Sequence, residues 1–139
     1  MFARWKEKRT AKQAKDQAIA ESQYWKTHPR LQDCLQAMRG GCTVAPMEMH
    51  EAAIAVVNIA LTEDLWKTTA KIPKDFLPDQ VFLVWNDEKI PVLKAPQELV
   101  NEALPLVTAV APMTFLVSEC LDRIIWFDES GQIKLYSIA

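Results

Sequence analysis

Apolar and polar positions follow a clear β pattern at the C-terminal end of the chain. Residues 123–127 (RIIWF) and 132–138 (QIKLYSI) are two apolar, β-prone runs that flank the polar sequence Asp-Glu-Ser-Gly at 128–131. This pattern predicts a β-hairpin. Because an isolated hairpin is at best marginally stable, we expect another part of the fold to cover its apolar face.

Three further apolar runs predict the rest of a sheet. Residues 81–85 (VFLVW) and 114–118 (TFLVS) have the composition of buried strands. Residues 90–93 form another candidate strand, and Pro91 indicates that it lies at an edge or is very short. A helix is expected between these runs, over 96–104. Together with the C-terminal hairpin, the runs predict about five strands.

Helical patterns dominate the first half of the chain. Residues 3–26 contain no Gly or Pro and are rich in Ala, Lys, Gln and Glu, which favours a helix. A short helix is predicted over 30–38. Apolar residues recur at helical spacing, on nearly all sides, over 46–61, which predicts the main buried helix. That helix continues or restarts through Trp66 and ends before Pro73.

Helical and strand segments are segregated along the chain and do not alternate. This order favours an α+β fold, with N-terminal helices packed on an antiparallel sheet, over a doubly wound parallel sheet. A length of 139 residues is that of one domain. We therefore expect residues 1–139 to form a single domain, with 1–40 as a candidate peripheral helical segment.

Charge is unevenly distributed along the sequence. Residues 1–17 contain six basic and two acidic residues, a net charge of +4, and the remainder contains ten basic and sixteen acidic residues, a net charge of −6. An acidic body disfavours extensive nucleic-acid binding and suits a basic protein partner.

Cysteine spacing and hydropathy indicate a soluble protein of the cytoplasm. Cys34, Cys42 and Cys120 form neither a C-x-x-C pair nor a four-ligand metal set, and we expect reduced thiols. No secretory signal is recognisable. The longest uncharged run, 103–118, contains two prolines and is shorter than the roughly 18 to 20 residues of a membrane span.

Residue patterns for catalysis are weak. His50 begins the sequence H-E-A-A-I, which lacks the second histidine of a zinc motif, and His28 precedes a proline. Three glycines in all provide no phosphate-binding loop. We therefore predict neither an enzyme, nor a metal site, nor a cofactor.

Acidic pairs and tryptophans occur together at two predicted turns. Trp85 precedes Asp87 and Glu88, and Trp126 precedes a second acidic pair. If both hairpins share a sheet and point the same way, four carboxylates converge at one end. Aromatic anchors beside charges are typical of protein interfaces, although both tryptophans could equally lie in the core. The candidate partner-binding residues are Trp85, Asp87, Glu88, Asp122, Trp126, Asp128 and Glu129.

The chain resembles immunity proteins of bacterial polymorphic toxin systems, including those of contact-dependent growth inhibition. The resemblance rests on the C-terminal sequence 124–136 (IIWFDESGQIKLY), on the length of the chain and on its acidic body. The resemblance implies an α+β protein that neutralises a cognate toxin, often a basic nuclease, by covering its active site. It carries no functional motif that could be transferred residue by residue.

Two other functions remain open from the sequence. A nucleic-acid or ribosome-associated accessory protein would use the basic residues of 1–17. A small-ligand-binding domain would use an apolar pocket between the long helix and the sheet. The basic residues in question are Arg4, Lys6, Lys8, Arg9, Lys12 and Lys15.

Overall fold

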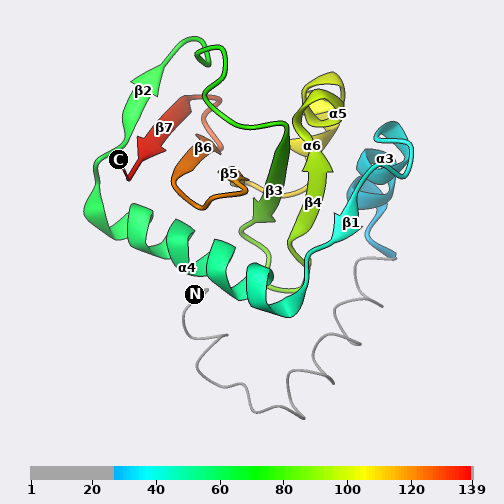
Figure 1. Ribbon diagram of the computed structural model, residues 1–139. Helices are drawn as coiled ribbons and strands as arrows, with labels where there is room; N and C mark the ends of the chain where they lie inside the picture. Colours follow the sequence, from blue (N-terminus) through cyan, green and yellow to red (C-terminus); the bar gives the residue numbers. More distant parts are fainter. Residues whose placement is uncertain (1–26, 139) are drawn as a thin grey trace.

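The computed structural model describes residues 27–138 (Figure 1). The predicted helix over 3–26 and the basic residues of 1–17 lie outside this range. In chain order, the elements are α3 (Pro29–Ala37), β1 (Thr43–Val44), α4 (Met47–Glu63), β2 (Lys67–Thr69), β3 (Gln80–Trp85), β4 (Leu93–Pro96), α5 (Gln97–Glu102), α6 (Leu104–Val107), β5 (Thr114–Ser118), β6 (Arg123–Phe127) and β7 (Ile133–Ser137).

The strands form one sheet in the order β1-β4-β3-β5-β6-β7-β2, and every neighbouring pair is antiparallel. The predicted α+β class and the C-terminal hairpin, β6–β7, are confirmed. Among the described residues the sheet has seven strands and not about five, because two short edge strands, β1 and β2, carry no recognisable β pattern. Short edge strands limit pairing with other chains.

Helices cover both faces of the sheet. Alternate residues of β3 point to opposite sides, so Val81, Leu83 and Trp85 join a core with α3, α5 and α6. Phe82 and Val84 join a second core with α4. The central strands β3 and β5 are therefore buried on both faces, which explains their nearly continuous apolar composition.

Helix α4 is the longest described helix and lies across one face of the sheet (Figure 1). Its buried side chains include Ala53 and Val57, whereas Ile59 is 52% exposed. Helix α4 is thus the described helix with the most buried residues, as predicted, but it covers one face of the sheet and is not surrounded by other elements on all sides.

Helix α4 also ends earlier than the sequence pattern predicted. Its last residue is Glu63, and Asp64 takes a left-handed conformation with φ of 53°. Trp66 then packs against Trp126, with ring centroids 5.2 Å apart, and its Nε1 donates to the Ala60 carbonyl at 3.0 Å. These contacts direct the chain into β2 at the sheet edge instead of a further helical turn.

Of the two alternatives predicted from Pro91, the edge strand is wrong, and the neighbouring strand is short, with four residues. Strand β4 begins two residues later, at Leu93, and lies between β1 and β3. The proline therefore stands outside the ladder, where its missing N–H removes no strand hydrogen bond. Within residues 27–138, no helix combines the length and hydrophobicity that a membrane crossing requires.

Candidate functional site

The two predicted acidic turns lie at the same end of the sheet. Strand β3 is antiparallel to β5, and β5 is antiparallel to β6, so β3 and β6 run in the same direction. The turn after β3 contains Asp87 and Glu88, and the turn after β6 contains Asp128 and Glu129. Only β5 separates the two parent strands. The Met113 N–H donates to Asn86 Oδ1 at 2.9 Å and links the first turn to the start of β5.

Asp128 organises its own turn. Its Oδ1 accepts hydrogen bonds from the Ser130 N–H at 3.0 Å, the Ser130 hydroxyl at 2.7 Å and the Gln132 N–H at 2.9 Å. Its Oδ2 lies 3.4 Å from the Lys134 ammonium. The Ser130 hydroxyl, followed by these other donors, lowers the Asp128 pKa below its ordinary value. The Asp128 carboxylate is thus engaged in hydrogen bonds within the turn, whereas the Glu129 side chain is exposed.

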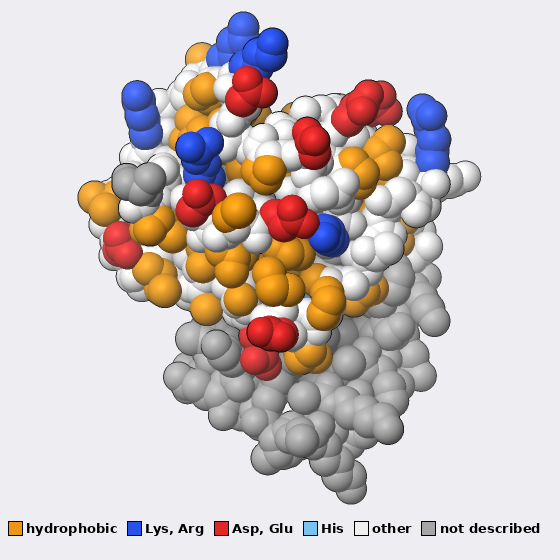
Figure 2. Space-filling view, viewed as in Figure 1, with side chains coloured by type: hydrophobic (Ala, Val, Ile, Leu, Met, Phe, Trp, Pro, Cys, Tyr) orange, Lys and Arg blue, Asp and Glu red, His pale blue; other side chains and the backbone are white. Residues whose placement is uncertain are grey.

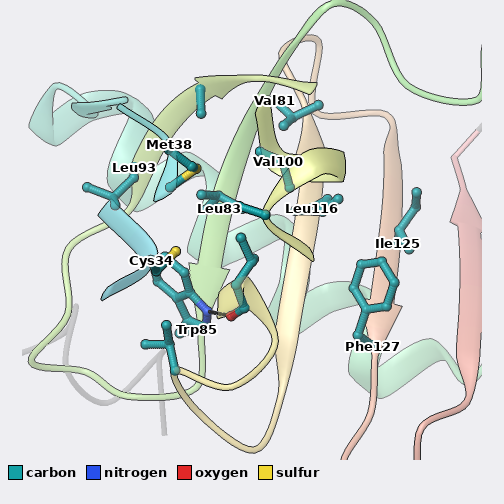
Figure 3. Packing of buried hydrophobic residues seen from close by; sticks show 14 of the residues in the cluster. Cys34, Met38, Val81, Leu83, Trp85, Leu93, Val100, Leu116, Ile125 and Phe127 are labelled. Atoms are coloured by element: carbon teal, nitrogen blue, oxygen red, sulfur yellow. Dashed lines mark hydrogen bonds between the residues drawn. The ribbon is translucent and has the colours of Figure 1, made fainter. Parts of the chain in front are cut away.

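Trp85 lies in the core and not at the surface. Its side chain is 2% exposed, and Nε1 donates to the Val107 carbonyl at 3.0 Å. Figure 3 shows the indole among the buried side chains of the α3 and α5 layer. The assignment of Trp85 to a partner-binding surface is therefore wrong, because its ring cannot reach a partner without unpacking this layer.

Trp126 occupies an aromatic cluster on the α4 face. Its ring stacks on Phe115 at 5.7 Å and meets the edge of Trp66, and the Lys134 ammonium lies 4.5 Å from its centroid. The side chain is half-buried. Its Nε1 has no hydrogen-bond partner among the residues that the structure describes. Trp126 therefore helps to fix β2 and the end of α4 onto the sheet, with part of its ring at the surface.

Asp122 does not converge with the other candidates. It lies in the turn between β5 and β6, at the opposite end of the sheet. The buried Ser118 hydroxyl donates to Asp122 Oδ1 at 2.7 Å, and the same hydroxyl oxygen accepts from the Asp122 and Arg123 N–H groups. Asp122 thus stabilises this turn.

An acidic hollow that the sequence analysis did not find lies at this opposite end. It occupies about 910 Å³ between the connection before β3 and helix α5. Four exposed carboxylates and one lysine line it, a net charge of −3, and they are Asp75, Asp79, Glu98, Glu102 and Lys74. The sequence separates the two acidic pairs by about twenty positions. The pairing of Gln80 with Pro96 brings them together, and the Gln97 N–H donates to the Asp79 carbonyl at 2.7 Å.

An apolar hollow of about 650 Å³ lies at the end that carries the acidic turns. It is bounded by α6, the loop at 108–112 and the turn of the β6–β7 hairpin. Leu104, Val110, Phe127 and Ile133 contribute apolar lining, and Arg30, Asp128 and Glu129 contribute charges.

The face that carries α4 differs from both hollows. Acidic and basic side chains are interspersed there with a group of hydrophobic ones (Figure 2).

Cys34 and His50 are buried, whereas the Cys120 thiol is exposed. Burial raises the pKa of the Cys34 thiol to about 12, with a further contribution from nearby Cys42, whose own pKa is raised mainly by burial. His50 is buried, and its Nδ1 accepts from the Val92 N–H at 3.2 Å, which joins α4 to the chain before β4. Within residues 27–138, no three His, Cys, Asp or Glu side chains are grouped as a metal site.

No protein-family model matches the chain, and no curated protein sequence matches it. The structure itself defines an α+β domain on an antiparallel sheet, with an acidic hollow at one end and an apolar hollow at the other.

Proposed function

We propose that this protein is a cytoplasmic binding protein that neutralises a cognate, basic, nuclease-type toxin by forming a stoichiometric complex. The acidic hollow carries the proposal. Its four exposed carboxylates and single lysine form a concave, negatively charged surface. Such a surface complements the positive surface that a nuclease uses to hold nucleic acid.

The net charge of the whole described region also favours a basic partner. Residues 27–138 contain nine basic and fifteen acidic residues, a net charge of −6. Opposite net charges accelerate the encounter of two proteins, and this acceleration decreases as the salt concentration rises. A surface of this charge supports fast capture of a basic partner.

The two alternative functions lack a comparable observation. The basic residues that would contact nucleic acid lie in 1–17, outside the described residues. The small-ligand alternative requires a pocket between α4 and the sheet, and fully buried side chains such as Ala53, Val57, Phe115 and Val117 fill that interface.

The test begins with the neighbouring genes: if one of them encodes a large secreted protein, the C-terminal domain of that protein is co-expressed with this chain. We expect that domain alone to stop growth, and co-expression to restore growth and yield a 1:1 complex by light scattering. Asp79→Lys should lower the association rate about tenfold, because it reverses a charge within the acidic hollow.

Asp33→Lys is the matched control. Asp33 is an exposed carboxylate on α3 that does not line the acidic hollow. Its reversal changes the net charge by the same amount and should alter the association rate much less. Equal effects of the two reversals would remove the acidic hollow from the interface. A toxic neighbour that is neither bound nor neutralised would refute the proposed function.

A further inference from the structure

The outward face of α4 is apolar at its centre. Its sheet-facing residues are buried. The positions that share the opposite face, at helical spacing, are Glu48, Ala52, Ala55, Ile59 and Thr62. The three central residues are apolar, and hydrophobic side chains gather on the face of the molecule that carries α4 (Figure 2). A helix at a protein surface usually carries polar residues there, so this face suits a further layer of protein.

Carboxylates gather where α4 begins. The Ala45 N–H donates to the Val92 carbonyl at 2.9 Å, and the Val92 N–H donates to His50 Nδ1 at 3.2 Å. These bonds hold the first turn of α4 beside the turn between β3 and β4. The charged residues of these two segments, with a net charge of −3, are Glu48, Glu51, Asp87, Glu88 and Lys89. The sequence contains no lysine or arginine over 40–66, so α4 itself provides no cation that would balance them.

We infer that this face of α4 is the docking surface for residues 1–26 of the same chain. Those residues include seven basic and three acidic ones, a net charge of +4, which complements the carboxylates where α4 begins. Their apolar side chains, which can pack on the apolar centre of the face, include Phe2, Trp5, Ile19 and Trp25. The inference goes beyond the proposed function and does not depend on it.

The first described residues lie at the end of the sheet where α4 begins. Near the start of α3, Arg30 Nη1 donates to the Ala109 carbonyl at 3.3 Å. The loop that contains Ala109 is joined to the turn between β3 and β4, because the Asn86 N–H donates to the Met113 carbonyl at 3.2 Å. That turn adjoins the first turn of α4. Residues 1–26 therefore join the described part of the chain close to the proposed docking surface.

The segment is also long enough for this contact. Twenty-six residues span up to roughly 85 Å as an extended chain and about 40 Å as a helix, whereas the 17 residues of α4 are about 25 Å long. Residues 1–26 can therefore pass around the end of the sheet and lie along α4.

The acidic hollow is the competing surface for a basic segment. It lies at the opposite end of the sheet from the start of α3, and Arg39, after the end of α3, already lies 4.0 Å from Glu102 there. The α4 face combines negative charge, apolar side chains and proximity to residue 27, and this combination favours it.

Carbodiimide cross-linking of the full-length protein tests where the segment lies. The reagent forms an amide between a lysine amine and a carboxylate in contact with it, and takes up the water that is released. We expect cross-links from the lysines of 1–26 to the four carboxylates of α4 and the neighbouring turn, identified by mass spectrometry. Cross-links mainly to the acidic hollow, or none to α4 and this turn, would overturn the inference.

Mixed isotope labelling separates the chain's own segment from a second copy. Unlabelled and ¹⁵N-labelled proteins are mixed in equal amounts and cross-linked, so that a link within one chain joins two peptides of the same isotope. We expect such links to predominate at every protein concentration. Links between the two isotopes in the proportion of random pairing would show that α4 receives a second copy, which would also overturn the inference.

Substitution at the centre of the face tests the apolar contact. Ile59 is exposed, so Ile59→Lys should fold, but its charge should raise the rate of amide hydrogen exchange over 3–26 about tenfold. Ile59→Leu should retain the slow exchange. Leu106→Lys is the matched control, because Leu106 is an exposed apolar residue of α6, on the other face of the sheet.

Exchange is measured by mass spectrometry on the full-length protein, and Leu106→Lys should leave the exchange over 3–26 unchanged. Equal rates over 3–26 in Ile59→Lys and the unmodified protein would contradict the docking. None of these measurements uses the toxin, so their failure leaves the proposed function intact, and failure to bind the toxin leaves the docking intact.

Discussion

Trp85 and Trp126 stand in similar local sequences, each near the end of an apolar strand and before an acidic turn, but they have different environments. Trp85 points toward the layer of α3, α5 and α6 and is hydrogen-bonded to Val107. Trp126 points toward the α4 layer and has no such bond in the described region. The two strands lie equally far from an edge of the sheet, so the role of each ring depends on which face its strand position selects and on what covers that face.

Phenylalanine substitutions should separate these two roles. Trp85→Phe leaves a buried carbonyl without its donor and a partly empty site, and we expect the free energy of unfolding to fall by roughly 2 to 4 kcal/mol. Trp126→Phe removes no described hydrogen bond and should lower the free energy of unfolding by about 1 kcal/mol or less. Urea unfolding measures both, and equal losses would contradict the assignment of Trp85 to the core.

Asp128 should make stability depend on pH in the acid range. Its pKa is lowered in the folded protein, so its contribution is complete above the unfolded-state pKa of about 4 and is lost as the pH falls through the folded-state value. Asp128→Asn should therefore flatten the decline of stability below about pH 4. Thermal unfolding between pH 2 and 6 measures this slope, and Glu129→Gln is the neighbouring control. An unchanged slope in Asp128→Asn would contradict the role of the turn.

At the scale of elements, helix α4 shows how a tertiary contact ends a local pattern. The apolar periodicity extends beyond Glu63, but Asp64 adopts the left-handed conformation and Trp66 turns onto the sheet. Ordinary L-residues are strained in that conformation, and aspartate tolerates it better than most. The cost at Asp64 is offset by the packing of Trp66, Trp126 and Tyr136.

Replacing Asp64 with glycine should therefore stabilise the protein. Glycine adopts the left-handed conformation without Cβ strain, and Asp64→Gly should raise the free energy of unfolding by roughly 0.5 to 1 kcal/mol. Gly131→Ala is the reciprocal change, since Gly131 has φ of 88°, and it should destabilise by about 1 kcal/mol. Denaturant midpoints measure both changes. A loss of stability in Asp64→Gly would show that the aspartate side chain itself stabilises the turn that follows α4.

At the scale of the whole molecule, the sheet separates the two hollows. The acidic hollow lies where β3 begins and β4 ends, and the apolar hollow lies where β6 ends and β7 begins. Because β3 and β6 run in the same direction, these positions are at opposite ends of the sheet. The two hollows share no lining residue. The effects of substitutions in each hollow on partner binding can therefore be measured independently.

The sequence alone determined the fold class and the C-terminal hairpin, whereas the common end of the two acidic turns depended on the pairing of β3, β5 and β6. The class and the hairpin follow from local apolar periodicity and turn residues, which act over a few neighbouring positions. It did not reveal β1 or β2, which are too short to show a β pattern and form only by pairing with distant strands.

Only the tertiary structure decided which candidate residues share a surface. Asp79 and Glu98 line one hollow because β3 and β4 pair in a particular register, and Trp85 is buried because helices from two parts of the chain cover its face. Local sequence determines which side chains alternate along a strand. What lies over each face depends on long-range packing, which no local pattern encodes.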